Sequence, residues 1–430
     1  MRILMVTNSY APYVGGIEKS IQSFAQYFRA KGHSVLVIAP KSDKPVEDEQ
    51  DVMRVSAINN FNDTNFPVTI PLPGEIRSRI KDFKPDIVHS HFPFIIGSTA
   101  LRIAAAREIP LVFTYHTMYE RYIHYINADS ERVKRFVRSV TKGYSNLCDK
   151  IIAPSRAVKN MLLNRGVKTP IVVIPSGIEV QQFKTGRGQE LRESCGLPRD
   201  SFLIGHIGRF APEKNLDFLL SSVIKVLKAN SNSRFLAVGD GPQKSELEKK
   251  VREEGVSDRV VFTGMLSGQK LYDAYDAIDV FAFSSKTETQ GMVLAEAMAS
   301  GTPVVALNAP GVDDILEDGK NGLMVQNENA DSFAGVISEF KELPDTEKND
   351  MRKNAEKTAE KFSIDACSDA VLQQYTELCS NRKDALTEKH QDSWQNSMEL
   401  IKAEWEIFRN YVSAAGMMFY SRRSKGQFKE

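Results

Sequence analysis

At 430 residues the chain exceeds the size of one ordinary hydrophobic core, which predicts two domains and an appended segment. Hydrophobic residues make up 42% of it and charged residues 26%, values typical of a globular protein that exclude disordered and collagen-like classes. The N-terminal apolar run is too short for a signal peptide, and the sequence contains no run of about 18 apolar residues that would span a membrane. The cysteines lack paired spacing. We therefore expect a cytoplasmic protein with reduced thiols.

The near-neutral total charge hides an asymmetry between the two halves. Residues 1–175 carry 24 Lys and Arg against 15 Asp and Glu, a net charge of +9, and the remainder carries 32 against 40, a net charge of −8. A basic half is expected to attract anionic lipid, nucleic acid or phosphorylated ligands. A chance surface excess remains the alternative.

The first half opens with a strand, a loop and a helix. Residues 2–8 form an apolar run typical of a buried strand, Gly15 and Gly16 open the next helix, and Gly32 ends it before a strand at 34–40. Later apolar runs bounded by turn residues predict further strands at 86–91, 111–116, 150–155 and 171–177.

The same order recurs about 200 residues later. A strand at 202–208, a loop, a helix at 216–229 and a strand from 234 begin the second half, and further strands are expected at 259–264, 280–285 and 302–307. Alternating strands and helices predict α/β architecture with two doubly wound, Rossmann-like domains. Ligands of such sheets bind beyond the carboxyl ends of the strands, so we expect two rims facing an interdomain cleft, with a hinge at 176–200.

Two glutamates bracket a glycine turn in the stretch ETQGMVLAEAMAS. Gly291 allows a tight turn, and the helix that follows begins with unpaired amides and a positive dipole, which suits a diphosphate. Glu296 lies about one turn inside, where its carboxylate would accept both hydroxyls of a ribose, and Glu288 would reach a sugar beyond the diphosphate. The alternative is a capping box between Thr287 and Gln290, with both glutamates serving as helix-start acids.

A basic loop strengthens the nucleotide-sugar interpretation. Arg209 and Lys214 flank a loop that opens a helix, where two cations would hold a diphosphate, although a solvated basic loop is the alternative. Gly15 and Gly16 would let backbone amides approach an anion, which is a weak signal by itself. The chain has neither a dinucleotide-binding G-x-G-x-x-G in these loops nor a P-loop.

Several motifs in sequence order resemble one known family. The chain is similar over residues 1–378 to the retaining nucleotide-sugar glycosyltransferases of family 4, which have the GT-B fold, and the E-x7-E stretch is the most specific match. The motifs that carry the resemblance are GGIEKSI, HSHFPF, TYHTMYERY, APSRAVKN, IPSGIEVQQF, GRFAPEKNL, VGDGP and ETQGMVLAEAMASGTPVVA.

The resemblance assigns roles around the donor. It implies that Arg209 and Lys214 hold the diphosphate, that Glu296 binds the ribose, and that Glu288 binds the sugar. It further implies that phosphates and sugar are contacted by the amides of Gly291, Met292 and Val293.

Further positions follow from the same resemblance. Gly16, beside Gly15, would approach the diphosphate from the opposite domain, and Met265 with Leu266 would meet the base. His116 matches the family's histidine beside the donor sugar, and it joins Glu288, Arg209 and Lys214 as the catalytic set. Gln290 stands where many members carry an aromatic residue, so its contact with the donor departs from the family pattern.

The resemblance implies a retaining transfer in which the leaving diphosphate accepts the proton of the incoming hydroxyl. No cofactor is expected, and the absence of Asp-x-Asp argues against an obligatory metal ion. His89, His91, His116 and His124 are a conceivable zinc set, but no acidic or cysteine ligand clusters with them, which argues against a metal site.

The stretch TYHTMYERYIHY is similar to diacylglycerol glucosyltransferases of bacteria, which implies a hexose transfer from a nucleotide sugar, UDP-glucose favoured, to a membrane lipid. Alternatives are a hexosyl- or mannosyltransferase with a polysaccharide, lipid-linked glycan or small-molecule acceptor, a GT-B epimerase, and a non-catalytic nucleotide-sugar binder. No nucleic-acid partner is expected.

A basic amphipathic helix is predicted just after this stretch. One face is apolar, and it would lie either at the anionic inner face of the cytoplasmic membrane or in the protein core. The membrane-binding candidates are Arg132, Lys134, Arg135 and Arg138.

We expect domains at 1–178 for the acceptor and 179–378 for the donor, with a helical segment at 379–430 that crosses back onto the N-terminal domain. Within 390–412 an apolar seam with steps of four and three would pack inside the chain, or form a homodimer or a membrane contact. The seam consists of Trp394, Met398, Ile401, Trp405, Phe408 and Val412.

Overall fold

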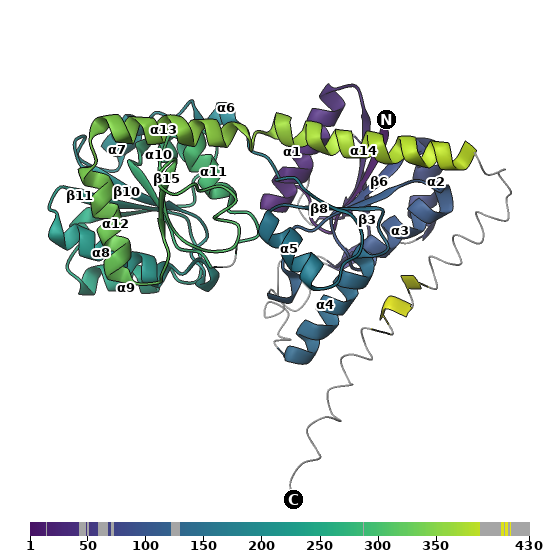
Figure 1. Ribbon diagram of the computed structural model, residues 1–430, viewed down its shortest axis with the longest axis horizontal. Coiled ribbons are helices and arrows are strands. Elements are labelled where there is room, and N and C mark those ends of the chain that lie inside the picture. Colours follow the sequence, from purple (N-terminus) through teal and green to yellow (C-terminus); the bar gives the residue numbers. More distant parts are fainter. Residues whose placement is uncertain are drawn as a thin grey trace, which may run out of the picture. The chain divides into compact units, whose positions relative to one another are not determined.

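The computed structural model divides the chain into two compact units, residues 1–175 with 368–430 and residues 176–367 (Figure 1). Each unit contains a parallel sheet with helices on both faces, which confirms the predicted class of two Rossmann-like α/β units. The residues that the structure describes are 1–13, 15–42, 49, 51–58, 68–69, 73–121, 130–286, 288–387, 406–407, 409–411 and 413.

The sheet of the first unit has seven parallel strands in the order β3-β2-β1-β6-β7-β8-β9. The strand order reverses between β1 and β6, which is where doubly wound sheets bind ligands. The strands are β1 Arg2–Val6, β2 Ser34–Pro40, β3 Val52–Val55, β6 Ile87–Ser90, β7 Leu111–Thr114, β8 Lys150–Ala153 and β9 Ile171–Val173, with a separate antiparallel pair β4 Ala57–Ile58 and β5 Val68–Thr69. The helices are α1 Gly16–Ala30, α2 Pro73–Phe83, α3 Ile95–Arg107, the 3-10 turn η2 Tyr119–Arg121, α4 Glu131–Ser145 and α5 Arg156–Asn164.

The sheet of the second unit has six parallel strands in the order β12-β11-β10-β13-β14-β15, and its order reverses between β10 and β13. The strands are β10 Phe202–Ile207, β11 Ser233–Val238, β12 Val260–Gly264, β13 Val280–Phe283, β14 Val304–Leu307 and β15 Gly322–Val325. The helices are α6 Val180–Phe183, α7 Gly188–Ser194, η4 Pro212–Lys214, α8 Leu216–Ala229, α9 Lys244–Glu253, η5 Ser257–Arg259, α10 Gln269–Ala277, α11 Met292–Ala299, α12 Ala330–Glu342 and α13 Asp345–Glu360.

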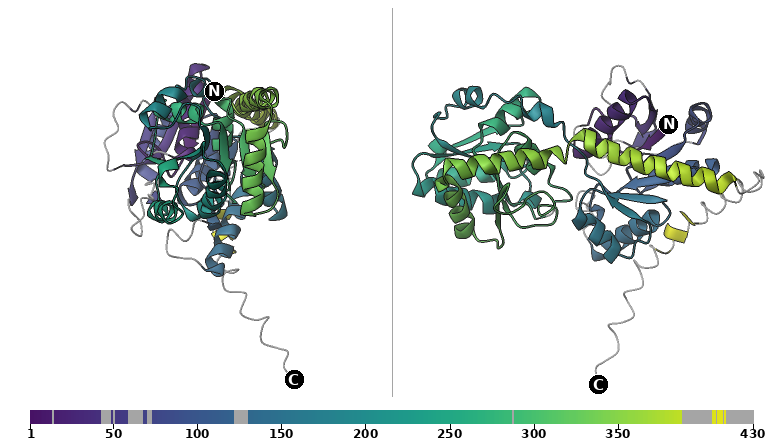
Figure 2. Two further views of the ribbon diagram at one scale, coloured as in Figure 1. Left: turned by 90° about the vertical axis from the view of Figure 1, so that its left-hand side faces the viewer. Right: turned by 45° about the horizontal axis from the view of Figure 1, so that its top comes forward.

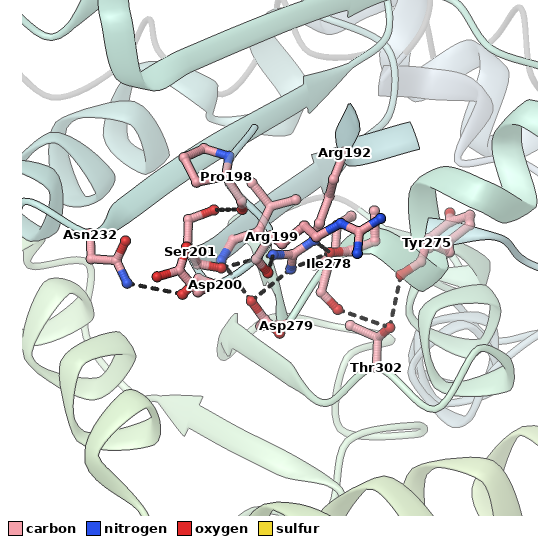
Figure 3. A network of polar contacts seen from close by, with 12 residues as sticks. Arg192, Pro198, Arg199, Asp200, Ser201, Asn232, Tyr275, Ile278, Asp279 and Thr302 are labelled. Atoms are coloured by element: carbon pink, nitrogen blue, oxygen red, sulfur yellow. Dashed lines mark hydrogen bonds and ion pairs between the residues drawn. The ribbon is translucent and has the colours of Figure 1, made fainter. Parts of the chain in front are cut away.

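The stretch 176–200, expected to be a hinge, is instead folded into the second unit. Arg192 on α7 is only 4% exposed, donates to the carbonyl of Ala277 at 2.9 and 2.6 Å, and pairs with Asp279 at 2.9 Å (Figure 3). A buried arginine is tolerated only with such partners, so this network fastens α7 to the start of β13. The division between the units therefore falls at 175/176, ahead of the predicted 178/179.

Helix α14 (Ile364–Thr387) is one continuous helix that contributes to both units (Figure 2). Its first residues pair with the second unit, where the amide of Ile364 donates to the carbonyl of Ile178 at 2.9 Å. From Ser368 onward it belongs to the first unit, where Asp369 accepts from Tyr27 at 2.7 Å and Gln374 accepts from Lys150 at 2.8 Å. The second boundary is thus 367/368 and not the predicted 378/379.

A short C-terminal piece lies against α4. Ile407 is buried in the core of the first unit, and the side-chain amide of Asn410 donates to the carbonyl of Val140 at 3.1 Å. A Cβ atom on Gly143 would lie 1.7 Å from Asn410, so only glycine permits this approach. The predicted seam residues Trp394, Met398, Ile401, Trp405, Phe408 and Val412 lie outside the described residues.

Candidate active site

The candidate donor residues lie at the switch point of the second unit's sheet. Arg209 and Lys214 follow β10, and Glu288 follows the neighbouring strand β13. Because β10 and β13 are parallel, their carboxyl ends meet at the same edge of the sheet. Lys214 and Glu288 form an ion pair there, with side chains 22% and 15% exposed.

Two serines hold the loops of this ion pair together. The hydroxyl of Ser284 donates to the carbonyl of Lys214 at 2.9 Å, and that of Ser285 donates to the carbonyl of Glu213 at 3.0 Å. Both serines are buried directly after β13. Each bond therefore fixes the backbone that carries Lys214 against the backbone that leads to Glu288.

The loop after β11 supports the backbone around Arg209. The amide of Phe210 donates to the carbonyl of Asp240 at 2.9 Å. A Cβ on Gly241, at φ 157°, would lie 2.3 Å from the carbonyl oxygen of Phe210, so this contact requires glycine. The Arg209 side chain itself is exposed.

Helix α11 begins at Gly291, which has the left-handed backbone conformation φ 66°, ψ 40°. No side chain caps this helix start, although Thr287, one half of the alternative capping box, lies outside the described residues. The amides of Met292 and Val293 lie at this helix start, which is the kind of end that generally favours an anion. Gln290, just ahead of it, is buried, and within the described part of the chain its Nε2 atom has no hydrogen-bond partner.

Glu296 lies on α11 beside a buried tyrosine. The hydroxyl of Tyr275, on α10, donates to Oε2 of Glu296 at 2.6 Å. Burial, followed by the charge of Glu296, raises the pKa of Tyr275 well above its usual range, so the hydroxyl keeps its proton. This hydrogen bond orients the Glu296 carboxylate against α10.

Met265 and Leu266 follow β12 at the same edge of the sheet. The Met265 side chain is 79% exposed, whereas Leu266 packs against the core of the unit. A large exposed apolar side chain at a ligand-binding edge suits the face of a nucleotide base.

In the first unit, Gly15 is the N-cap of α1 and Gly16 is its first residue, at the end of the loop that follows β1. A Cβ on Gly15 would lie 2.5 Å from a carboxylate oxygen of Glu18, whereas Gly16 has open space around its Cα. The N-cap residue Gly15 has no side chain with which to cap α1, as Gly291 has none at α11.

His116 follows β7 and is buried with two other histidines. Its Nε2 atom lies 2.9 Å from Nδ1 of His91, and Nε2 of His89 lies 2.7 Å from the hydroxyl of Thr114. Burial lowers the pKa of His116 to about 4 and that of His89 to about 3. Within the described part of the chain, which excludes His124, no three His, Cys, Asp or Glu side chains are arranged to hold a metal ion.

The basic helix α4 packs its apolar face into the first unit. Of the two roles predicted for this face, contact with a membrane or packing in the core, the structure shows the second. Val137 and Tyr144 are buried in the core and Phe136 packs against it, so that the apolar face is core. Arg132 and Arg138 are exposed, whereas Lys134 and Arg135 are half-buried. Among the described helices, none has the length and apolar character that crossing a bilayer requires.

Sequence reasoning missed Tyr275, Ser284 and Ser285. The serines had a usable signal, because two hydroxyl residues directly after a buried strand stand at the ligand-binding edge of a parallel sheet. Tyr275 had none, since its contact with Glu296 arises only when α10 packs beside α11.

Comparison with known proteins identifies the family. Two family models match, "Glycosyltransferase Family 4" over residues 14–182 and "Glycosyl transferases group 1" over residues 188–358. The chain is 30% identical over 346 residues to an alpha-monoglucosyldiacylglycerol synthase of Streptococcus pneumoniae, covering 79% of this chain and 78% of that protein.

Similarity also extends to another donor class and to solved structures. A GDP-mannose-dependent alpha-mannosyltransferase of Corynebacterium glutamicum is 28% identical, over 88% of this chain and 89% of that protein. The structure of Anabaena HepE in complex with UDP matches with a TM-score of 0.68 at 21% identity, over 88% of this chain and 100% of that chain. The chain therefore belongs to family 4 of the glycosyltransferases, enzymes of the GT-B fold that depend on a nucleotide sugar.

Proposed function

We propose that the chain is a retaining glucosyltransferase that moves glucose from UDP-glucose to a membrane lipid such as diacylglycerol, as a peripheral protein at the inner face of the cytoplasmic membrane. One observation carries the donor half: Lys214, Glu288 and the uncapped start of α11 converge at one edge of the second unit's sheet. UDP is favoured by the likeness to HepE, which was solved with UDP. The lipid is favoured by the likeness to a synthase whose name specifies an alpha-linked glucosyldiacylglycerol.

In the proposed complex the diphosphate binds at the first amides of α11. The dipole and the unpaired N–H groups of that end favour an anion, and Arg209 with Lys214 adds two positive charges. Lys214 and Glu288, which pair with each other in the structure, would then take separate partners, the diphosphate and a sugar hydroxyl. Glu296, which Tyr275 orients, binds the ribose through its carboxylate oxygens, and Met265 and Leu266 contact the base.

The proposed transfer needs no protein nucleophile. The bond from the anomeric carbon to the diphosphate oxygen breaks, the acceptor hydroxyl forms its new bond on the same face, and the leaving diphosphate takes the hydroxyl proton. UDP-glucose is itself an alpha-glycoside, so an alpha-linked product means retention. The protein stabilises the charge that develops on the diphosphate, and fixed cations and amides do this without reorganisation.

Contact with the membrane is proposed to be electrostatic. Residues 1–175 carry a net charge of +9, and Arg132 and Lys142 on α4 are exposed. Since the apolar face of α4 is core, the helix would approach anionic lipid through its charges and would not insert.

The test supplies four donors separately, UDP-glucose, UDP-galactose, UDP-GlcNAc and GDP-mannose, with and without anionic liposomes that contain diacylglycerol. Release of the nucleoside diphosphate and label in the organic phase are measured. Lipid-dependent release from UDP-glucose alone is the expected result. Release from GDP-mannose would favour the mannosyltransferase alternative, conversion of donor without acceptor an epimerase, and binding without turnover a non-catalytic binder.

A further inference from the structure

Two hydrogen-bonded rungs join the ends of β6 and β7. His89 is the register partner of Val112 in this parallel pair. Side chains two residues apart on a strand share a face, so His89 and His91 lie on the face that also carries Thr114 and His116. The rungs are His89 to Thr114 at 2.7 Å and His91 to His116 at 2.9 Å, each spanning 25 residues of sequence.

The second rung leaves one nitrogen of His91 alone. Nδ1 of His91 is bonded to His116, whereas Nε2 of His91 is buried and has no partner among the residues that the structure describes. Burial lowers the pKa of both rings, to about 4 in His116, so each ring is neutral near pH 7 and carries one N–H hydrogen. One ring must therefore donate and the other must accept.

The two ways of placing these hydrogens differ in their cost. If His116 donated, His91 would carry its hydrogen on Nε2, as a buried N–H group without an acceptor. If His91 donates from Nδ1, its Nε2 atom is only an unused acceptor. Unpaired buried donors are avoided more strictly than unused buried acceptors, so the second arrangement is favoured.

We propose that His91 is a positioning residue that donates its Nδ1 hydrogen to Nε2 of His116 and thereby holds His116 in the tautomer with hydrogen on Nδ1. That N–H is then the group that His116 offers to a hydroxyl of the donor sugar, a role that rests on the proposed function. Because Nε2 of His116 is bonded to His91, Nδ1 is the nitrogen of His116 that is left to contact the sugar.

Neighbouring groups keep His91 in place. The rings of His89 and His91 lie 4.0 Å apart, and those of His91 and His116 lie 5.2 Å apart and stacked. His89 uses both nitrogens, with Thr114 on one side and the hydroxyl of Tyr375 on the other. The orientation of His91 is therefore set by packing against a ring that is itself bonded on both sides.

The experiment compares His91→Asn with His91→Leu in protein labelled with 15N in histidine, using His116→Gln to assign the signals. The Asn side chain places an amide donor near the position of Nδ1, whereas Leu offers none. Long-range proton–nitrogen correlation should show hydrogen on Nδ1 of His116 in the wild type and in His91→Asn. In His91→Leu we expect the Nε2–H form to appear and kcat with UDP-glucose to fall about 10-fold, with a smaller change in KM, because one oriented hydrogen bond is lost.

Tyr375→Phe is the matched control, since it removes a hydrogen bond from His89 and leaves the rung between His91 and His116. Its His116 signals should match the wild type. An Nε2–H tautomer of His116 in the wild type, or an unchanged Nδ1–H tautomer in His91→Leu, would overturn the proposal. If the wild type transferred no sugar from any donor, the proposed function would fail while the nitrogen signals would still decide the tautomer.

Discussion

The hydroxyl of Tyr275 donates a 2.6 Å hydrogen bond to the carboxylate of Glu296, which joins helix α10 to helix α11 beside the candidate donor site. A carboxylate that one oriented donor holds presents its remaining acceptor sites in one direction. The contact therefore links the packing of two helices to the orientation of the carboxylate that we propose binds the ribose.

Replacing Tyr275 by Phe should weaken donor binding and leave the fold intact. Without the Tyr275 hydroxyl the Glu296 carboxylate loses the donor that orients it, so we expect the Kd of UDP, measured by calorimetry, to rise about 10-fold, the effect of losing roughly one net hydrogen bond to the ligand. Tyr272→Phe is the control, because its hydroxyl bonds to Gln182 on the surface. Equal Kd values in the two variants would remove Tyr275 from the site.

Replacing Lys214 by Ala should abolish most turnover. Losing one donor to a developing oxyanion costs about 10²–10³ in rate, and Glu288 also loses its ion-pair partner. Lys286→Ala is the control, since Lys286 pairs with Glu328 in an exposed position. Steady-state rates with UDP-glucose measure the effect, and near-normal turnover of Lys214→Ala would contradict the assignment.

Replacing Gln290 by Leu should change stability and donor affinity in opposite directions. The amide of Gln290 is buried and its nitrogen lacks a partner, so a similarly sized apolar residue removes an uncompensated polar group. We expect an unchanged or higher Tm without ligand, together with weaker binding of the nucleotide sugar. A fall in Tm with unchanged affinity would mean that Gln290 is structural.

The first unit should lose stability in mild acid faster than the second. Burial lowers the pKa of His89, His91 and His116 in the first unit, and the second unit carries only His206, whose pKa is lowered to about 4. A lowered pKa means that the folded state favours the neutral ring, so this stability is complete above pH 6.5 and is lost as the pH falls towards about 4.

The free energy of unfolding is expected to fall more steeply with decreasing pH in the first unit than in the second. Below pH 6.5 each such histidine lowers the free energy of unfolding by about 1.4 kcal/mol per pH unit. Three histidines therefore lower it by about 4 kcal/mol per pH unit in the first unit, compared with about 1.4 kcal/mol for the single histidine of the second. Calorimetry at pH 7, 6 and 5, with hydrogen exchange of peptides from each unit, would measure the two losses separately. Parallel losses in both units would contradict the prediction.

Reversing the charge of Arg132 and Lys142 should weaken binding to anionic liposomes. Both side chains are exposed on α4, and each basic residue near an anionic surface contributes about 1 kcal/mol. Lys249→Glu with Lys357→Glu, two exposed positions of the second unit, makes the same change in net charge and serves as the control. If both double variants lost binding equally, total charge and not α4 would be responsible.

The sequence predicted the central strands because they are buried on both faces and appear as continuous apolar runs. The strand β1 and the strand β10 are of this kind. Of the edge strands, β9 and β12 were predicted, whereas β3 and β15 were not: β3 contains an arginine and is only half-buried, and β15 has just four residues, beginning at the glycine of an Asn-Gly pair. An edge strand needs only one apolar side, so its local signal is weak.

The same contrast applies to the site. Glu288, Lys214 and Glu296 were predicted because charged groups beside glycine turns and helix starts have a local physical meaning. Tyr275 meets Glu296 across 21 residues and His91 meets His116 across 25, so their contacts depend on helix packing and strand register. The resemblance supplied His116, but its bond to His91 required the fold.

Because Tyr375 lies on α14, the first unit to leave the ribosome is the last to be completed. Its ring packs on Phe28 with centroids 5.8 Å apart, and its hydroxyl bonds to His89, so both remain uncovered while residues 176–367 are being made. The second unit is contiguous in sequence and has all its parts as soon as it emerges. A chain released before residue 375 would therefore carry a complete second unit and a first unit in which Phe28 and His89 lack their contacts with Tyr375.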